Sequence, residues 1–289
     1  MADFNPQDFE QNPLRKYFRQ PKVYTTLPSK GKFYPSGALE MPETGELPVF
    51  AMTAKDELSM KTPDALLNGQ ATVDLIKSCV PNIKDPWSMP SIDLDALLIA
   101  IRIATYGEKM DITTKVPKLG EERSFEVDLR QLLNKLVTVD FETEILNGEM
   151  VVEIRPLTYK EFTASSLKTF EEQRIFAVLN NTQLPDHEKL AKFNESFQKL
   201  TTLTMEVLTK SVAKISVGDT IVTKPEHIDE FIRNTDKDFC KAITEHLEEQ
   251  KAKFQIEPLK VHSSKEDIEE GAPESYEVPI TFDQSNFFA

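Results

Sequence analysis

The chain of 289 residues has few cysteines and no long hydrophobic run. Cys79 and Cys240 have no second cysteine or histidine at metal-binding spacing, so we expect reduced packing residues rather than a disulfide or a reactive thiol. No apolar stretch approaches the roughly 20 residues needed to cross a bilayer, which predicts no membrane segment. Residues 1–10 hold three acids and no apolar core. Since a secretory signal needs such a core, we expect the protein to stay in the cytosol where it is made.

Positive charge is also scarce. The sequence has 34 Lys and Arg against 48 Asp and Glu, a net charge of -14, which repels phosphate backbones and disfavours general nucleic-acid binding. The distribution is uneven, because residues 14–34 contain six basic residues and no acid, whereas residues 262–289 contain one lysine and seven acids. A nucleic-acid-binding module that uses the basic, aromatic segment 14–34 therefore stays open as an alternative.

Catalytic and metal-binding patterns are missing. The four histidines show no H-x-H or H-E-x-x-H spacing, and no serine lies in a G-x-S-x-G turn. Residues 116–120 have the frame of a zinc knuckle, but Val116 and Leu119 stand where zinc needs cysteines. A former metal site that now packs apolar side chains and an ordinary Pro-Gly turn are equally good interpretations. We predict no enzyme, no cofactor and no metal site.

Short strands are predicted in the first half of the chain. Proline and glycine punctuate residues 21–50 too often for a helix and leave strands at 22–26 and 47–51. Strand-like sequence returns at 110–128 and 137–154, where Asn147-Gly148 is a strong hairpin-turn signal. These strands, together with the helices below, predict an α+β fold.

A buried helix is predicted at residues 93–106, which are apolar on almost every face and are followed by Gly107 as a C-cap. Arg102 within it needs a carboxylate or carbonyl partner, because an unpaired buried charge is costly, and we expect a structural ion pair. Other helices are predicted to start at Thr62 and to cover residues 70–80.

A strand, a threonine and a helix follow one another in two similar segments, 49–57 and 153–161, and more loosely in a third, 220–226. An acidic residue comes three positions after each threonine, the spacing of a capping box. The sequence therefore predicts that Thr53, Thr158 and Thr223 each start a helix.

The second half is predicted to be mainly helical. A long helix starts near Pro185, and a further helical pattern follows Thr223. We interpret the apolar stripes of both as core, with an exposed partner groove as the alternative. The stripes are Leu190, Phe193, Phe197, Leu200, Val207 and Leu208 in the long helix, then Ile228, Phe231, Ile232, Phe239, Ile243 and Leu247.

These patterns divide the chain into four parts. They are a flexible N-terminal arm (1–20), an α+β domain with strands packed on the buried helix (21–136), a mainly helical domain with a β-hairpin (137–260) and an acidic extended tail (261–289). We predict that the two ends bind partner proteins, since extended aromatic segments add to sheet edges or fill apolar grooves. The tail folding back onto its own domain is the alternative. The predicted partner-binding residues are Arg15, Lys16, Tyr17, Phe18, Arg19, Phe282, Phe287 and Phe288.

Four segments of this sequence occur in the same order in the T-even-type bacteriophage base plate hub and tail-assembly protein family, which the chain resembles over about residues 22–175. They are Leu27–Pro35 (LPSKGKFYP), the helix start Met52–Glu57, Asp95–Gly107 with its ending RIATYG, and Arg155–Thr158. Family members carry a cysteine-rich knuckle after the Tyr-Gly pair, where this sequence has Val116 and Leu119. The resemblance therefore implies no zinc site here.

The resemblance implies a non-enzymatic structural or assembly protein of the base plate hub of a contractile tail. Its partners are then other base plate hub or tape-measure proteins, and a homo-oligomer stays open. The implied location is the host cytoplasm during assembly, and the virion tail base plate for a structural component. The alternative is a transient tail-assembly chaperone that is absent from the mature virion.

Overall fold

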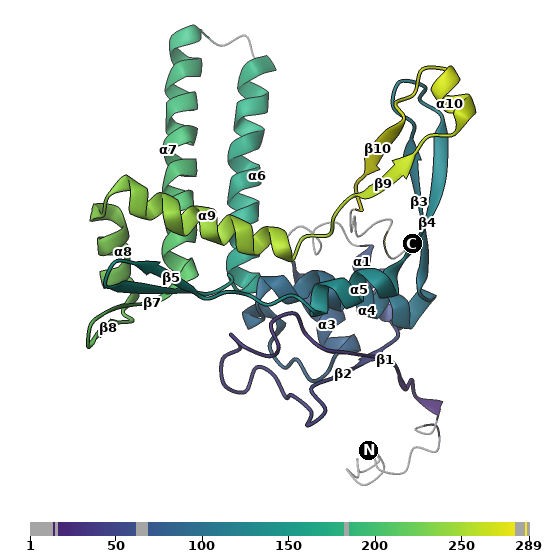
Figure 1. Cartoon of the computed structure of the whole chain (residues 1–289), viewed down its shortest axis with the longest axis horizontal. Helices are drawn as coiled ribbons and strands as arrows, with labels where there is room; N and C mark the ends of the chain where they lie inside the picture. The colour runs from purple at the N-terminus through teal and green to yellow at the C-terminus, as the bar shows by residue number, and fades with distance from the viewer. Residues whose placement is uncertain (1–13, 15–16, 62–68, 182–184, 281–286, 288–289) are drawn as a thin grey trace, which may run out of the picture.

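The chain folds as an α+β protein, as predicted, with strands in the first half and a mainly helical second half (Figure 1). The computed structural model describes residues 14, 17–61, 69–181, 185–280 and 287. Predicted features outside these ranges are Arg15, Lys16, the helix start at Thr62, Phe282 and Phe288.

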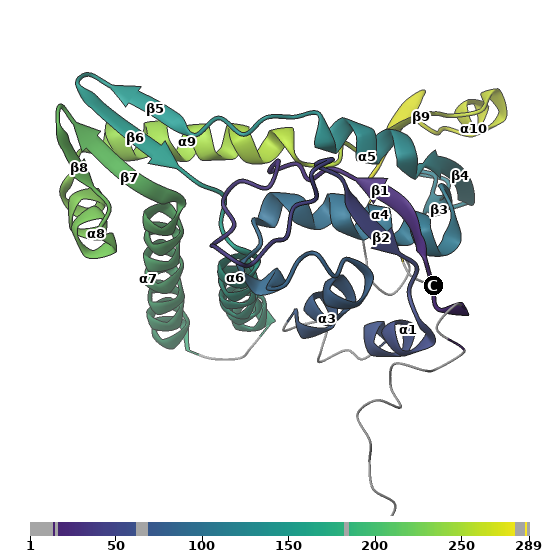
Figure 2. The same cartoon turned by 90° about the horizontal axis from the view of Figure 1, so that it is seen from below.

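Helix α4 is the centre of the first half. All its residues from 96 to 104 are buried, because strands β1 and β2 and helices α3 and α5 pack around it (Figure 2). Gly107 follows it at φ 100, which an L side chain rarely adopts, and so ends the helix. The bounds are β1 Pro21–Thr25, β2 Leu47–Phe50, α1 Ala54–Met60, α3 Gln70–Cys79, α4 Leu94–Tyr106 and α5 Leu129–Val137. The strands and α4 lie within one residue of the predicted ranges.

A four-stranded antiparallel sheet, in the order β5-β6-β7-β8, forms the second half with helices α8 and α9. Ile145, Val152, Ile215 and Val222 are paired across the sheet and belong to an apolar cluster that these helices complete. The predicted hairpin is confirmed, with Gly148 in the turn at φ 61. The bounds are β5 Glu144–Asn147, β6 Met150–Ile154, β7 Val212–Val217, β8 Thr220–Val222, α8 Pro225–Asn234 and α9 Lys237–Lys253.

Two long helices, α6 Tyr159–Asn181 and α7 Asp186–Ser211, connect β6 to β7. They pack against each other and project from the body as a helical hairpin (Figure 1). Within the described residues, no helix is long and apolar enough to span a membrane.

A second projection consists of two strand pairs, β3–β4 and β9–β10, which lie side by side (Figures 1 and 2). We call it the β arm. The bounds are β3 Lys109–Lys115, β4 Glu122–Asp128, β9 Leu259–His262, α10 Lys265–Glu269 and β10 Ser275–Val278. Most of the predicted acidic tail therefore lies in an ordered strand–helix–strand unit.

Candidate docking surfaces

The helical hairpin is fixed at its base by a capping box. The Thr158 hydroxyl accepts a hydrogen bond from the Glu161 N–H at 3.2 Å, and the Glu161 carboxylate accepts one from the Thr158 N–H at 2.9 Å. Arg155 donates two further bonds of 2.9 Å to the same carboxylate. Bidentate pairing of this kind has a defined geometry, so it sets the direction in which α6 leaves the sheet.

One side of the hairpin is charged. Lys199 pairs with Glu172 at 3.7 Å and with Glu195 at 2.9 Å, and Lys168 pairs with Glu206 at 3.5 Å. A cleft of about 570 Å³ lies among these residues. Because these five charges are paired within the hairpin, this side is typical of a solvated helix surface.

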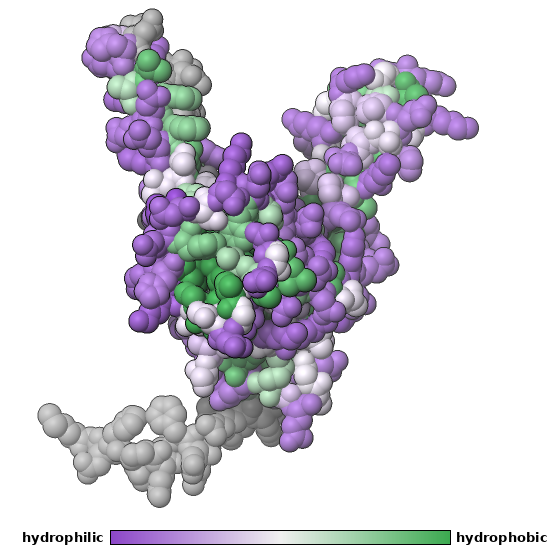
Figure 3. All heavy atoms as spheres, turned by 60° about the vertical axis from the view of Figure 1, so that its left-hand side comes forward, coloured by the Kyte–Doolittle hydropathy of each residue, from purple (hydrophilic) through white to green (hydrophobic). Residues whose placement is uncertain are grey.

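The other side of the hairpin has no charged residue between residues 162 and 173 of α6 or between residues 190 and 204 of α7. It carries exposed aromatic and aliphatic side chains, including Phe170 (53% exposed), Leu190 (61%) and Phe197 (59%). In the space-filling view, hydrophobic atoms line one edge of the hairpin (Figure 3). We call this side the uncharged face. Its residues are Phe162, Ser166, Thr169, Phe170 and Gln173 on α6, and Leu190, Phe193, Asn194, Phe197, Leu200, Thr201 and Thr204 on α7.

The prediction that the long helix buries its whole stripe is wrong for its outer half. Leu208 is buried at the base, where α8 packs on α7, but Leu190 and Phe197 lie beyond the reach of α8. Periodicity shows which side of a helix is apolar, but it does not show which segment covers that side. The exposure of this half agrees with the alternative, an exposed partner groove, while partner binding there stays a prediction.

The β arm is held together by contacts between segments far apart in sequence. Arg123 on β4 pairs with Asp267 on α10 at 2.8 Å, and the rings of Phe125 and Tyr276 lie edge to face at 6.4 Å. Hydrogen bonds from Ser264 and Arg123 lower the pKa of Asp267. The exposed acids of the arm's helical end are Glu266, Glu269 and Glu270.

The predicted N-terminal binding residues have different environments. Tyr17 and Phe18 are exposed, at 72% and 56%. Arg19 instead packs inside the first half, where it pairs with Asp56 at 3.6 Å and donates hydrogen bonds to Ser78 and to the Ala51 carbonyl. The prediction that Arg19 contacts a partner is therefore wrong for this structure, because its donors are used within the chain.

The predicted role of Phe287 also needs correction. Its ring is 2% exposed and belongs to the core around α4, so it is not available to a partner. The guanidinium of Arg102 lies 5.5 Å from the Phe287 ring and 4.9 Å from the Tyr106 ring. Arg102 has no ion pair within the described residues, and its Nε and Nη1 have no hydrogen-bond partner there. Burial lowers its pKa, and the aromatic rings replace the expected carboxylate.

The three predicted threonine caps differ. Thr53 makes a full capping box with Asp56 at the start of α1, equivalent to that of Thr158. Thr223 does not, since the N-cap of α8 is Lys224, followed by Pro225. Proline has no N–H, so the first helical position of α8 has no donor that needs a cap. The spacing of Thr223 and Glu226 therefore does not produce a capping box here.

Sequence reasoning missed a buried polar cluster in the LPSKGKFYP segment. Asp93 accepts hydrogen bonds from the Ser29 N–H (2.7 Å), the Ser29 hydroxyl (2.6 Å) and the Tyr34 hydroxyl (2.9 Å). Burial raises the pKa of Asp93 to about 6, although these bonds act in the other direction. Lys30 and Phe33 have positive φ angles, so the segment is a tight loop clamped onto the start of α4. The prolines and the glycine of this segment indicated a loop, but no local pattern pointed to Asp93, which lies 64 residues after Ser29.

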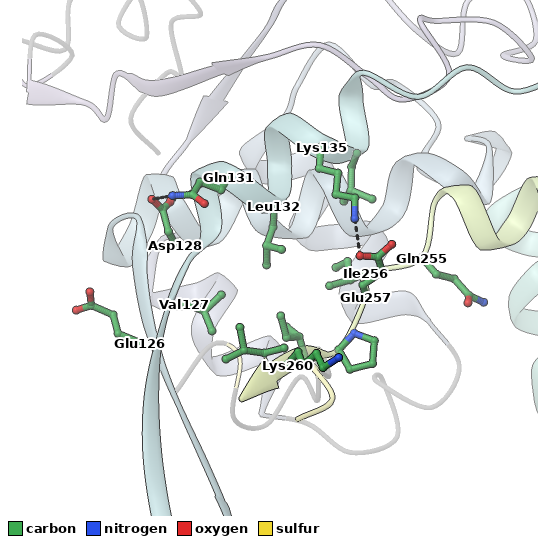
Figure 4. Close-up of a pocket in the computed structure, with 14 residues that line it drawn as sticks. Glu126, Val127, Asp128, Gln131, Leu132, Lys135, Gln255, Ile256, Glu257 and Lys260 are labelled. Atoms are coloured by element: carbon green, nitrogen blue, oxygen red, sulfur yellow. Dashed lines mark hydrogen bonds and ion pairs between the residues drawn. The ribbon is translucent and has the colours of Figure 1, made fainter. Parts of the chain in front are cut away.

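A cleft of about 420 Å³ lies between α5 and residues 255–260, and Lys135 and Glu257 pair at 2.7 Å across it (Figure 4). It contains no cysteine, serine or histidine. Elsewhere, burial raises the pKa of the Cys79 thiol to about 11, which keeps it protonated at neutral pH. Among the described residues, no group of three or more His, Cys, Asp or Glu is arranged to hold a metal.

Comparison with known proteins gives one result at the level of the family. The family model described as T4 bacteriophage base plate protein matches residues 20–270, which include the helical hairpin, strands β3, β4 and β9 of the β arm and most of both apolar cores. Strand β10 and Phe287 lie beyond the matched residues. No curated protein and no solved structure matches the chain.

Proposed function

Because the chain belongs to the T4 bacteriophage base plate protein family, we propose that it is a non-enzymatic component of the base plate hub of a contractile tail. It acts by docking to other proteins, and its heterologous partners are other hub or tape-measure proteins. The observation that carries this proposal is the uncharged face of the helical hairpin.

The composition of this face supports docking. Cores of protein interfaces are depleted in charged residues and enriched in aromatic ones, and monomeric soluble proteins rarely expose large contiguous apolar patches. Charged residues make up 28% of this chain, yet the uncharged face has none and exposes Phe162, Phe170, Phe193 and Phe197. A surface of this kind is costly in water and gains free energy when a partner covers it.

The β arm supplies a second surface of opposite character. Glu266, Glu269 and Glu270 lie at its end in a short helix, while Asp267 is held by Arg123. An acidic end of this kind favours basic partner surfaces and speeds association electrostatically. The two projections thus provide the protein with one apolar and one acidic contact.

The experiment is quantitative mass spectrometry of purified, finished tails. A hub component is present at a fixed copy number, whereas the alternative, a transient assembly chaperone, is absent from finished tails and present only in assembly intermediates. Phe197→Asp should reduce incorporation into tails. The matched control is Leu167→Asp, which adds the same charge on the other side of α6, where Leu167 is 38% exposed. Normal incorporation of the Phe197→Asp protein would show that the uncharged face of the hairpin is not a docking surface.

Nucleic-acid binding by residues 14–34 is weakened as an alternative. Two of the six basic residues already have acidic partners within the chain, since Arg19 pairs with Asp56 and Lys30 pairs with Asp140. We expect no gel shift with random single-stranded DNA at moderate salt. A shift that Lys22→Glu and Lys32→Glu abolish would restore this alternative.

A further inference from the structure

The two helices of the hairpin turn their uncharged residues to the same side. Ser196, which is 2% exposed, marks the side of α7 that packs on α6, and Glu172 marks the corresponding side of α6 through its pair with Lys199. Successive helix residues are rotated by about 100°. On that basis Phe162 and Phe170 lie on the same side of the hairpin as Leu190 and Phe197, and the ion pairs lie on the other. The uncharged face is therefore continuous across both helices.

This face is wider than a single helix can cover. Phe170 is rotated by about 160° from the line between the helices and Leu190 by about 120°, so the two side chains diverge toward opposite edges of the hairpin. A lone helix, about 10 Å across, covers only the middle of this face and leaves these edges in water. A partner two helices wide covers both edges. The hairpin of a second copy has this width.

Charge also favours a second copy. Each chain has a net charge of -14, so two copies repel one another over most of their surfaces. The uncharged face is a region where they can meet without burying an unpaired acid, which would be costly. Among possible partners, the chain's own hairpin meets this requirement without any further assumption, because both sides of the contact have the same uncharged composition.

We propose that two copies of this chain associate through their uncharged faces, packing the two hairpins into a four-helix arrangement about a two-fold axis. This inference rests on the proposed docking function and names the occupant of the same surface. Phe197 and Leu190 of one copy pack against α6 and α7 of the other. The β arms and the remaining surfaces stay free for other tail proteins.

The size of the face predicts a reversible dimer. Leu190 to Thr204 covers about 22 Å along α7, and two helices are about 20 Å wide, which gives about 450 Å² per copy. The total, about 900 Å², is close to the lower limit of about 1,000 Å² for a specific interface. We therefore expect dissociation in the micromolar range.

Sedimentation velocity of the full-length chain between about 1 and about 100 µM, a range that brackets the expected affinity, tests the proposal. We expect the sedimentation coefficient to rise with concentration from monomer to dimer. Raising the salt should tighten the dimer, because screening weakens the repulsion between acidic copies and no ion pair is lost. An interface made of ion pairs would respond in the opposite direction.

Variants decide which surface is responsible. Phe197→Asp should weaken the dimer at least tenfold, whereas Leu167→Asp should leave it unchanged; unchanged melting temperatures would show that both variants fold. A chain that is monomeric at the highest concentration overturns the proposal. So does a dimer that Phe197→Asp does not weaken, or that Leu167→Asp weakens equally. If the chain is monomeric but Phe197→Asp still prevents incorporation into tails, docking to another tail protein stands and the second copy does not.

Discussion

The guanidinium of Arg102 lies 5.5 Å from the ring centroid of Phe287, a contact that joins the middle of the buried helix α4 to the C-terminal end of the chain. Tyr106 faces the same guanidinium at 4.9 Å. A charge inside the first core is thus stabilised by aromatic rings, with no carboxylate paired to it within the described residues.

Removal of the Phe287 ring should destabilise the protein strongly. Phe287→Ala is expected to lower the free energy of unfolding by about 3 kcal/mol, because it opens a cavity in the core and uncovers Arg102. Urea unfolding measures the change. Phe18→Ala, at a position that is 56% exposed, is the control and should change little. A loss below about 1 kcal/mol for Phe287→Ala would show that the ring does not pack as described.

Neutralising Arg102 should be tolerated. Its Nε and Nη1 have no hydrogen-bond partner in the described part of the chain, so Arg102→Met removes a desolvation cost while keeping most of the side-chain volume. We expect the free energy of unfolding to stay constant or to rise by about 1 kcal/mol. Arg130→Met breaks a more exposed ion pair, that of Arg130 with Glu108, and should lower the free energy of unfolding slightly. A clear loss in Arg102→Met would show that the contacts of the guanidinium with the Phe287 and Tyr106 rings outweigh its desolvation cost.

Arg19 should matter for stability and not for partner binding. Arg19→Ala leaves Asp56 without its cation and the Ser78 hydroxyl and the Ala51 carbonyl without a donor, so we expect a loss of about 2 kcal/mol in urea unfolding. Lys22→Ala, which changes an exposed basic residue nearby, is the control and should have no measurable effect. Equal stability of the two variants, with weaker partner binding by Arg19→Ala alone, would restore the docking role.

Asp95 should make stability depend on pH. It lines a cavity of about 230 Å³ with Phe141 and Phe254, and burial raises its pKa from 3.8 to about 6. Between about pH 4 and pH 6 the folded protein therefore binds more protons than the unfolded chain, and this contribution to stability is lost as the pH rises. Asp95→Asn should stabilise the protein by about 1 kcal/mol at pH 7 and have little effect at pH 4.

Urea unfolding at pH 4, 5, 6 and 7 checks this prediction. Asp93, whose pKa is raised in the same direction, still titrates in the variant, so the pH dependence should become weaker without disappearing. Asp219→Asn, at an exposed position in the turn between β7 and β8, is the control for removal of one negative charge. A pH profile of Asp95→Asn parallel to that of the parent protein would show that Asp95 is solvated.

Local features could be predicted from the sequence. The helix at α4 follows from residues that are apolar on every face, and the Thr53 cap follows from an acid three positions later; both depend only on neighbouring residues. Strands β1 and β2 follow from the spacing of proline and glycine. In each case the sequence signal is local, whereas the pairing that holds the two strands together joins distant residues, such as Val23 and Val49.

The candidate site could not be predicted in full, because burial depends on distant segments. The same apolar spacing gives a buried Leu208 and an exposed Phe197 on one helix, and only the position of α8 distinguishes them. The sequence likewise predicts that Phe287 is an exposed aromatic near the C-terminus, whereas the structure places it in the core around α4. Helix periodicity identifies the part of the uncharged face on α7, but neither its exposure nor the part on α6.

Thr158 and Thr223 provide a matched test of the repeated strand–threonine–helix pattern. Thr158→Ala removes the hydroxyl that accepts from the Glu161 N–H, so we expect a loss of about 1 kcal/mol. Thr223→Ala should cost nothing measurable, because Lys224 and Pro225 start α8 without it. Urea unfolding measures both. Equal losses would mean that Thr223 caps α8 in solution. A loss of unfolding free energy above about 1 kcal/mol in Thr158→Ala would show that the base of the hairpin contributes to stability as a unit, since Arg155 and Glu161 also form their ion pair there.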